Sequence, residues 1–254
     1  MKLIKNKLRY GEIIAESYYL EENNGKVIIF CSGLPGTSSY SEIAEKYANE
    51  GFIFIHPKYF GSWESYGNFT LKGCKKTVVD FVNALKQNKV KTVFNQDFNV
   101  KIKDIFLLGH SFGGSIALCS GADLDIAGII ALAPVIDYRV QGKEDYKEEK
   151  MDELYNFIHS GFENVYRNLD KNDWIEFCLN GSVLNATDYL QQLNLKKILL
   201  IHGSEDTSVN YDRSKSFYSK IKNFGGEIDY LETKDTHSSI KLNSFEKIIS
   251  WIKK

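Results

Sequence analysis

The stretch that decides the fold is Asp104–Cys119, DIFLLGHSFGGSIALC. Its first part, IFLL, is an apolar run of strand length, and SIAL reads as the start of a buried helix. Gly109, Gly113 and Gly114 stand between the two, although glycine is a poor helix former. We therefore expect these glycines to serve a sharp turn that joins a strand to a helix.

Ser111 lies at the centre of this turn, in the pattern G-x-S-x-G. Between a strand and a helix, this pattern is typical of a nucleophile elbow, in which a strained backbone holds the serine hydroxyl clear of the sheet. Glycines at positions 109 and 113 tolerate the crowding on either side of Ser111. The helix N-terminus beneath the serine offers N–H groups to a developing oxyanion, and the Phe112 amide is expected to be one. The alternative is a glycine-rich turn without a catalytic role.

A nucleophilic serine needs a base, and the base needs an acid that orients it. In this arrangement the acid follows the serine along the chain and the histidine comes last. Of the five histidines, we expect His237 to be the base because it follows the last strand-like run. Glu205 and Asp206, after the run KKILLIHG, are the candidate acids, and Asp137 after the preceding run is a lesser alternative.

A second oxyanion donor is expected in the loop SGLPG, which follows the apolar run KVIIFC. Pro35 has no N–H group, so the backbone amides of Leu34 and Gly36 are the candidates. The alternative is a Gly-Pro turn with a structural role only.

The rest of the chain alternates strand-like and helical runs, and the strand-like runs are continuously apolar. Such runs suit strands that are covered on both faces, and their order predicts an α/β fold with one mostly parallel, doubly wound sheet. The first segment, LRYGEIIAESYYLEE, alternates more and predicts antiparallel strands. The expected parallel strands lie in Lys26–Cys31, Phe52–Pro57, Asp104–Gly109, Ile126–Pro134, Lys196–Gly203 and Glu227–Thr233.

One segment, from about residue 138 to 185, breaks this rhythm and contains no expected strand. Its apolar residues recur at helical spacing and predict one or two amphipathic helices, interrupted near Gly161. We expect a single domain over residues 1–254, with this segment as a helical cap over the carboxyl ends of the strands. Its aromatic side chains are expected to line the substrate pocket, although packing of the cap alone is the simpler interpretation for most of them. The candidates are Tyr155, Phe162, Tyr166, Trp174 and Phe177.

The composition excludes several classes of protein. A net charge of -1 over 254 residues gives no footprint for nucleic acid or for an anionic membrane. No apolar run approaches the ~18 residues of a membrane span, and the N-terminus lacks the apolar core of a signal peptide. The four cysteines are widely spaced without a CxxC pair, which favours buried reduced thiols. We expect a cytoplasmic protein that needs no metal or cofactor.

With these residues assembled, the chain resembles the α/β-hydrolase superfamily over nearly its whole length. GHSFGG is similar to the elbow of its serine hydrolases, and THSS matches the terminal histidine. LLIHGSEDTSV is similar to the HGxxDxxV segment, which implies that Asp206 is the acid. The superfamily's oxyanion donor falls on Leu34, although Ser32 replaces the usual histidine of that loop.

HPKYFGSWESYGNF is similar to a loop of prolyl-oligopeptidase-like hydrolases and of small dienelactone-hydrolase-like and cinnamoyl esterases, with Phe60 where arginine is common. The resemblance implies a cofactor-free serine hydrolase whose partner is a small ester with a small or aromatic acyl group. A small peptidase or amidase is the enzymatic alternative. A ligand-binding homologue without turnover and an interaction scaffold are alternatives of other classes.

Overall fold

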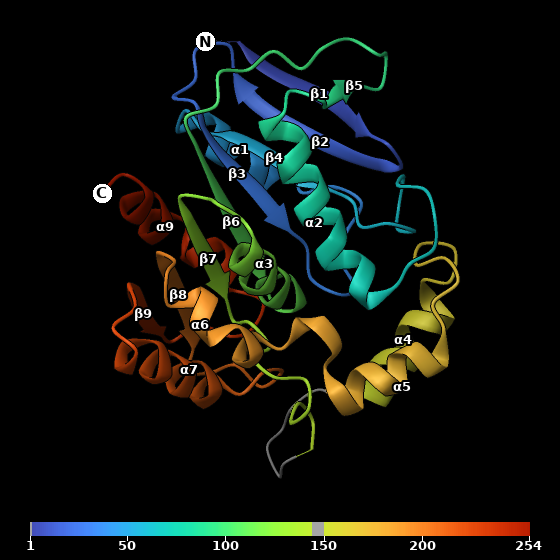
Figure 1. Cartoon of the computed structure of the whole chain (residues 1–254), viewed down its shortest axis with the longest axis vertical. Coiled ribbons are helices and arrows are strands. Elements are labelled where there is room, and N and C mark those ends of the chain that lie inside the picture. Colours follow the sequence, from blue (N-terminus) through green and yellow to red (C-terminus); the bar gives the residue numbers. More distant parts are fainter. Residues whose placement is uncertain (1, 144–149) are drawn as a thin grey trace.

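The alternating strand and helix runs form one nine-stranded sheet in the computed structural model, which describes residues 2–143 and 150–254 (Figure 1). The strand order across the sheet is β5-β1-β2-β4-β3-β6-β7-β8-β9. The strands are β1 (Leu3–Tyr10), β2 (Ile13–Leu20), β3 (Lys26–Cys31), β4 (Ile53–Pro57), β5 (Lys91–Thr92), β6 (Asp104–His110), β7 (Gly128–Leu132), β8 (Ile198–Gly203) and β9 (Ile228–Thr233).

The sheet is parallel from β4 to β9 and antiparallel at its other edge. β3 pairs with β4 and β6, and the series continues through β7, β8 and β9 with every pair parallel. The antiparallel start expected from the alternating first segment is the β1–β2 hairpin, which joins the sheet through β2 and β4. This arrangement is that of an α/β-hydrolase fold and confirms the fold class expected from the sequence.

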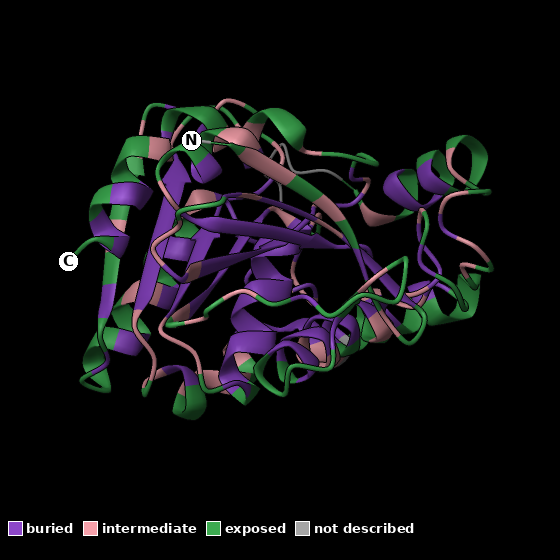
Figure 2. Cartoon of the chain, turned by 90° about the horizontal axis from the view of Figure 1, so that it is seen from above, coloured by how far each residue is buried: buried purple, intermediate pink, exposed green. Residues whose placement is uncertain are grey.

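Helices cover both faces of the sheet, and the outer surfaces of the helices are exposed (Figure 2). α2, α3 and α7 pack on one face, and α1 and α9 pack on the other. The helices are α1 (Ser41–Asn49), α2 (Leu71–Lys86), α3 (Phe112–Asp123), α4 (Met151–Gly161), α5 (Lys171–Asn180), α6 (Leu190–Leu193), α7 (Tyr211–Asn223), α8 (Ile240–Asn243) and α9 (Phe245–Ile252), with short 3-10 turns η1 (Ser182–Leu184) and η2 (Ala186–Tyr189).

Successive side chains of β3 point to opposite faces of the sheet and pack into two apolar clusters, one on each face. Val27 and Ile29 belong to the cluster under α2 and α3, whereas Ile28 and Phe30 belong to the cluster under α1 and α9. α3 is buried along nearly its whole length, so its sequence is apolar on every side rather than on one stripe.

α4 and α5 lie in the connection between β7 and β8, beyond the carboxyl ends of the parallel strands and near the start of α2 (Figure 1). Residues 144–149 of the expected insertion lie outside the described residues. α4 ends at Gly161, where the sequence predicts an interruption, and the helical spacing of apolar residues that continues to Leu169 does not form a helix. There the backbone instead bonds to the loop after β4, through Arg167 N to Gly61 O at 2.9 Å and Phe69 N to Arg167 O at 2.9 Å.

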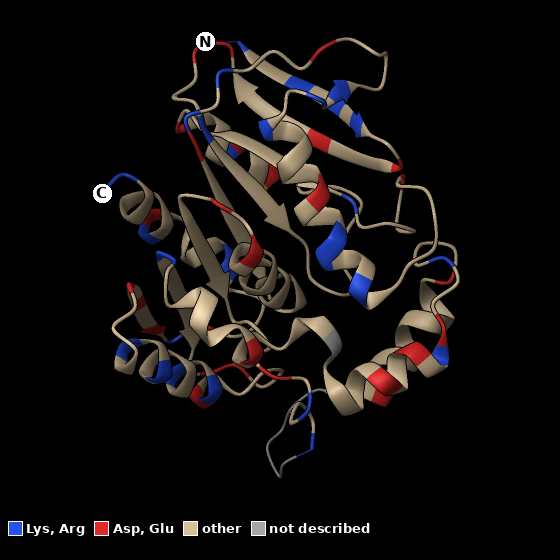
Figure 3. Ribbon diagram, in the orientation of Figure 1, with Lys and Arg blue, Asp and Glu red and all other residues tan. Residues whose placement is uncertain are grey.

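Residues of both charge signs lie on α2 and α7 (Figure 3), whereas a few charged residues, such as Lys58 and Asp206, are buried. Cys31, Cys74 and Cys119 are buried free thiols, and Cys178 is a half-buried one. Within the part of the chain that the structure describes, no helix has the length and apolar character to cross a membrane.

Candidate active site

Ser111 stands at the end of β6, on the turn into α3. Its φ is 57° and its ψ is -123°, a conformation that costs energy for a residue with a side chain. The turn is held by bonds from the Ser111 amide to the carbonyl of Leu132 at 2.9 Å and from the Gly114 amide to the carbonyl of Ser111 at 2.9 Å. The expected strand–turn–helix geometry around this serine is therefore present.

The flanking glycines are required by crowding rather than by their own φ. A Cβ at Gly109 would overlap the carbonyl of Gly113, and a Cβ at Gly113 would overlap the carbonyl of Cys31. A Cβ at Gly114 would lie 2.8 Å from Pro134 Cβ, which is inside van der Waals contact. The sequence DIFLLGHSFGG thus allows the turn, the neighbouring strand and the helix to approach one another.

Asp206 and His237 come together although 31 residues separate them. His237 Nδ1 lies 2.7 Å from Asp206 Oδ2, and the other oxygen accepts bonds from the amides of Ser208 at 2.8 Å and Val209 at 2.9 Å. Because Asp206 is an acceptor, Nδ1 carries the proton and Nε2 of the neutral ring is left able to accept one. This is the tautomer that a general base needs.

The contact between the loops after β8 and β9 depends on Gly203, where a Cβ would overlap the carbonyl of Asp235. The Ser204 amide also bonds to the carbonyl of Thr233 at 2.8 Å. The glycine of the HG pair thus lets the two loops, one with Asp206 and the other with His237, lie against each other.

Asp206 is buried, and burial raises the pKa of its carboxyl group. Hydrogen bonds from His202 and His237 outweigh that effect, so the pKa of Asp206 falls below its ordinary value. The carboxylate stays charged and can stabilise a protonated His237 during a reaction.

His202 is a second histidine on Asp206 that the sequence analysis did not assign. Its Nε2 lies 3.2 Å from Asp206 Oδ2 and 3.2 Å from the carbonyl of Val209. Because a carbonyl only accepts, Nε2 carries the proton, and Nδ1 accepts from the Ser214 hydroxyl at 2.7 Å. His202 and His237 therefore both bond to Asp206 Oδ2. Its only sequence signal was its place in HGSED, four residues before the acid.

His110, beside Ser111, bonds through Nε2 to the backbone carbonyl of His237 at 2.7 Å. Burial lowers the pKa of His110 to about 3, with a further contribution from His237, so the ring is neutral and donates this hydrogen bond. The bond fastens the His237 loop to the elbow that carries Ser111. Nothing in the sequence indicates this contact.

The two other candidate acids lie in different environments. The carboxylate of Asp137 binds Arg139 at 2.6 Å and Thr187 at 2.9 Å, and its pKa is lowered by these bonds against the effect of burial. Glu205 is exposed. Among the three acids that follow Ser111 in suitable loops, Asp206 is the one that the structure places on His237.

The loop after β3 carries the two candidate oxyanion amides, and the structure distinguishes them. Gly36 N donates to Tyr166 Oη at 2.8 Å, so this amide is occupied. For the Leu34 amide, no hydrogen-bond partner is found among the described residues. Phe112 is the first residue of α3, so its amide has no acceptor within the helix. Leu34 and Phe112 both line the small space beside Ser111.

That space has a volume of about 20 Å³ and is mainly apolar. Of the five aromatic residues expected to line a pocket, Trp174 and Phe177 border it. Tyr155 packs against Trp174 at 5.7 Å between ring centroids, and Phe162 packs against Tyr166 at 6.2 Å. The other bordering residues are Val135, Tyr138, Gln141, Met151, Leu154 and Val209.

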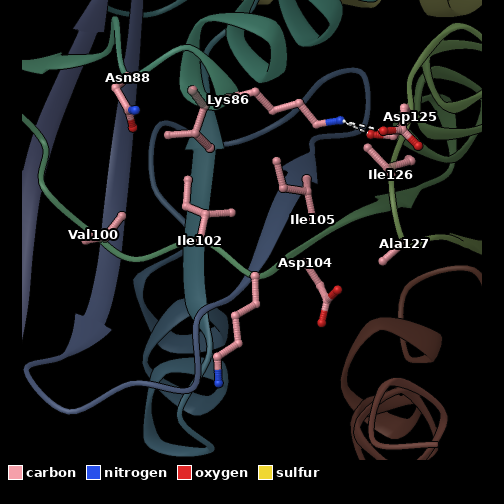
Figure 4. A pocket seen from close by; sticks show the side chains of 11 residues that line it. Lys86, Asn88, Val100, Ile102, Asp104, Ile105, Asp125, Ile126 and Ala127 are labelled. Carbon is pink, nitrogen blue, oxygen red and sulfur yellow. Dashed lines mark hydrogen bonds and ion pairs between the residues drawn. The ribbon is translucent and has the colours of Figure 1, made fainter.

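A wider hollow of about 530 Å³ lies at the amino ends of β6 and β7 (Figure 4). There Lys86 points to Asp125 and bonds to its backbone carbonyl. Ligand sites of parallel α/β sheets lie at the carboxyl ends of the strands, and Ser111, Asp206 and His237 all follow those ends. The smaller space beside Ser111 is therefore the candidate active site.

Comparison with solved structures gives the same fold. The esterase Pf2001 of Pyrococcus furiosus matches with a TM-score of 0.70 and 18% identity, over 99% of this chain and 89% of that one. Est1E of Butyrivibrio proteoclasticus, solved with ferulic acid bound, matches with a TM-score of 0.68 and 19% identity, over 97% of each chain. The acylaminoacyl peptidase of Pyrococcus horikoshii matches with a TM-score of 0.66 and 14% identity, over 100% of this chain but 41% of its own.

A search of curated protein sequences finds no match. The sequence profile of the prolyl oligopeptidase family matches residues 38–254, a range that includes Ser111, Asp206 and His237. Together with the sheet order and the elbow, this match shows that the chain belongs to the prolyl oligopeptidase family and is an α/β-hydrolase-fold serine hydrolase of the esterase or peptidase type.

Proposed function

We propose that this protein is a carboxylesterase that cleaves esters of small or aromatic acyl groups through an acyl-enzyme at Ser111. The observation that carries the proposal is the Asp206–His237 pair, in which Nδ1 of His237 lies 2.7 Å from Oδ2 of Asp206. His110 bonds the loop with His237 to the elbow with Ser111. A buried carboxylate, a histidine oriented by it through Nδ1 and a strained serine are the parts that nucleophilic acyl transfer requires.

In the proposed reaction, Ser111 Oγ attacks the ester carbonyl carbon and His237 Nε2 takes the hydroxyl proton. The amides of Leu34 and Phe112 bind the oxyanion of the tetrahedral intermediate. The bond to the alcohol oxygen breaks, and His237 returns its proton to that oxygen. Water then attacks the carbonyl carbon of the acyl-enzyme while His237 Nε2 takes its proton. The bond to Ser111 Oγ breaks, His237 returns the proton to Oγ, and the carboxylic acid is released.

The lining of the site supports the choice of substrate class. Leu34, Trp174 and Phe177 offer apolar and aromatic contacts beside Ser111, and such contacts suit an uncharged acyl group.

A peptidase or amidase is the second candidate, and the family match over residues 38–254 favours it. The two functions share the same nucleophile and differ in the bond that is cleaved. The test is to compare kcat/KM for p-nitrophenyl acetate and butyrate with kcat/KM for aminoacyl p-nitroanilides.

The esterase proposal expects turnover of the esters at rates well above those of the anilides, with loss of turnover in Ser111→Ala. Preference for anilides would support the peptidase. Tight binding of an ester by wild-type protein, with no release of product, would instead support a ligand-binding protein on this fold.

A further inference from the structure

Lys58 is a buried lysine that the proposed reaction does not use. It follows β4 and is 1% exposed. Its Nζ lies 2.8 Å from His56 Nδ1 and 3.6 Å from Glu16 Oε2, and it also bonds to the carbonyl of Ser38. Two of the three N–H donors of the ammonium group thus bond to His56 and Ser38, and Glu16 adds an opposite charge within ion-pair distance.

The surroundings of Lys58 act on its pKa in both directions, and the net shift is downward. Burial lowers its pKa, whereas Glu16 and Glu64 act in the opposite direction and Lys7 adds a small repulsion. Burial, with the positive charge of Lys58, holds the pKa of His56 well below its ordinary value, so His56 Nδ1 is an acceptor. A buried charge is costly unless it is paired and bonded, and this lysine is both.

Two of the contacts of this cluster reach the loop that carries Leu34. Lys58 holds the carbonyl of Ser38, and the hydroxyl of Ser39 donates to Glu16 Oε2 at 3.0 Å. The hydroxyl of Thr37 donates to the carbonyl of Ser39 at 2.8 Å. The Lys58–Glu16 ion pair is thus bonded to residues 37–39, which form the far half of the loop after β3.

The far half of this loop rests directly on the half with Leu34. A Cβ at Gly36 would lie 3.1 Å from both the carbonyl of Gly33 and the Cβ of Ser32, so the two halves of the loop are in close contact at this point. From the other side, Tyr59 Oη donates to the carbonyl of Ser32 at 2.8 Å. Residues 37–39 follow Gly36 directly in the chain, so we expect their position to affect the Leu34 amide two residues before it.

We propose that the buried Lys58–Glu16 ion pair positions the oxyanion hole by fixing the loop 32–40 at Ser38 and Ser39. Lys58 and Glu16 touch neither the substrate nor Ser111 in this account, so they are positioning residues. The inference rests on the proposed function, because it assigns the Leu34 amide to an oxyanion. It also explains why this chain keeps a charged pair inside the protein, at the expense of desolvation.

The test is the double variant Lys58→Met with Glu16→Gln, which removes both charges together and leaves neither one buried alone. The matched control is Lys5→Met with Glu45→Gln, which removes an exposed ion pair of 2.7 Å between β1 and α1. For each protein, kcat and KM for p-nitrophenyl acetate and the inhibition constant of a trifluoromethyl ketone are measured. The ketone adds to the serine and places an oxyanion in the hole, so it reports the hole independently of turnover.

We expect kcat to fall by about tenfold to a hundredfold, because one misplaced oxyanion donor costs at most about 10² to 10³. KM should stay within about twofold, the ketone should bind more weakly by the same factor as kcat/KM, and the control should match the wild type. Unchanged kcat and ketone affinity in the folded double variant would overturn the inference.

If the double variant does not fold, Ser39→Ala decides the question. It leaves the ion pair in place and should still lower kcat several-fold with KM unchanged, and an unchanged kcat there would equally overturn the inference. The proposed function is tested separately, since it fails when wild-type protein shows no turnover that Ser111→Ala removes. The inference fails when the wild type turns over and the variants do so equally well.

Discussion

Replacement of Phe177 by alanine should change which ester the protein prefers. Phe177 is 2% exposed and borders the space beside Ser111. Its ring centroid lies 4.3 Å from that of Tyr138 and 6.1 Å from that of Trp174. Removal of the ring therefore opens the apolar end of a space that measures about 20 Å³ in the wild type.

The lost ring leaves room for about four methylene groups, each worth ~0.8 kcal/mol when it is buried. The full gain for a hexanoyl over an acetyl group would be about 3 kcal/mol, and partial collapse of the cavity reduces it to about 1.5–2.5 kcal/mol. This corresponds to about a tenfold to seventyfold change in the hexanoate-to-acetate ratio of kcat/KM. The variant should also lose about 3–5 kcal/mol of stability, so the assay belongs well below its unfolding temperature.

The assay compares kcat/KM for p-nitrophenyl acetate and hexanoate in wild type, Phe177→Ala and Phe162→Ala. Phe162 is the matched control, because it is an aromatic residue of the same connection that packs on Tyr166 and does not border the space. The ratio should rise in Phe177→Ala and stay at the wild-type value in the control. An unchanged ratio in Phe177→Ala, or an equal rise in both variants, would refute the assignment of the acyl pocket.

Three further outcomes are expected. Asp206→Asn should lower kcat by about 10⁴-fold, because the amide no longer favours the required tautomer, whereas Asp137→Asn should leave kcat within a few-fold; the reverse order in steady-state assays would move the acid to Asp137. His202→Gln should lower kcat with little change in KM, since Asp206 loses a bond of 3.2 Å, and equal kinetics would show that His202 is dispensable. His110 has a pKa lowered from 6.5 to about 3, so between these pH values the unfolded chain binds a proton there that the folded chain does not, and stability falls as the pH falls. The free energy of unfolding is therefore measured with urea at pH 7 and at pH 5. From pH 7 to pH 5 it should fall less in His110→Gln than in the wild type, and an equal fall would contradict the neutral buried ring.

The sequence was sufficient for the succession of parallel strands along the chain and for the elbow, but not for the order of the strands across the sheet. Strands such as Lys26–Cys31 are continuous apolar runs. The G-x-S-x-G pattern indicated the glycines around Ser111, although the groups that crowd Gly113 and Gly114, Cys31 and Pro134, lie far away in the chain. β5 was missed because two residues, Lys91 and Thr92, carry no periodic pattern. The helix expected to continue towards Leu169 was lost to backbone bonds with residues 61–69, and such bonds to distant segments leave no periodic trace.

Some features of the candidate site could likewise be predicted from the sequence, and others could not. The order of serine, acid and histidine follows from chain connectivity, and it led to Asp206 and His237 once the resemblance was used. The roles of His110 and His202 depend on which loops touch, and a sequence contains no direct record of that. The aromatic residues differ for the same reason: Trp174 and Tyr155 both lie on helices of one connection, and only Trp174 borders the space beside Ser111.

The central claim is that Ser111 is an activated nucleophile, and covalent labelling tests it most directly. Wild-type protein is treated with a fluorophosphonate, digested and analysed by tandem mass spectrometry to locate the modified side chain. The account predicts stoichiometric phosphonylation of Ser111, with no labelling in Ser111→Ala and strongly slowed labelling in Asp206→Asn. Labelling of another serine, or equal labelling of the Ser111→Ala protein, would contradict it.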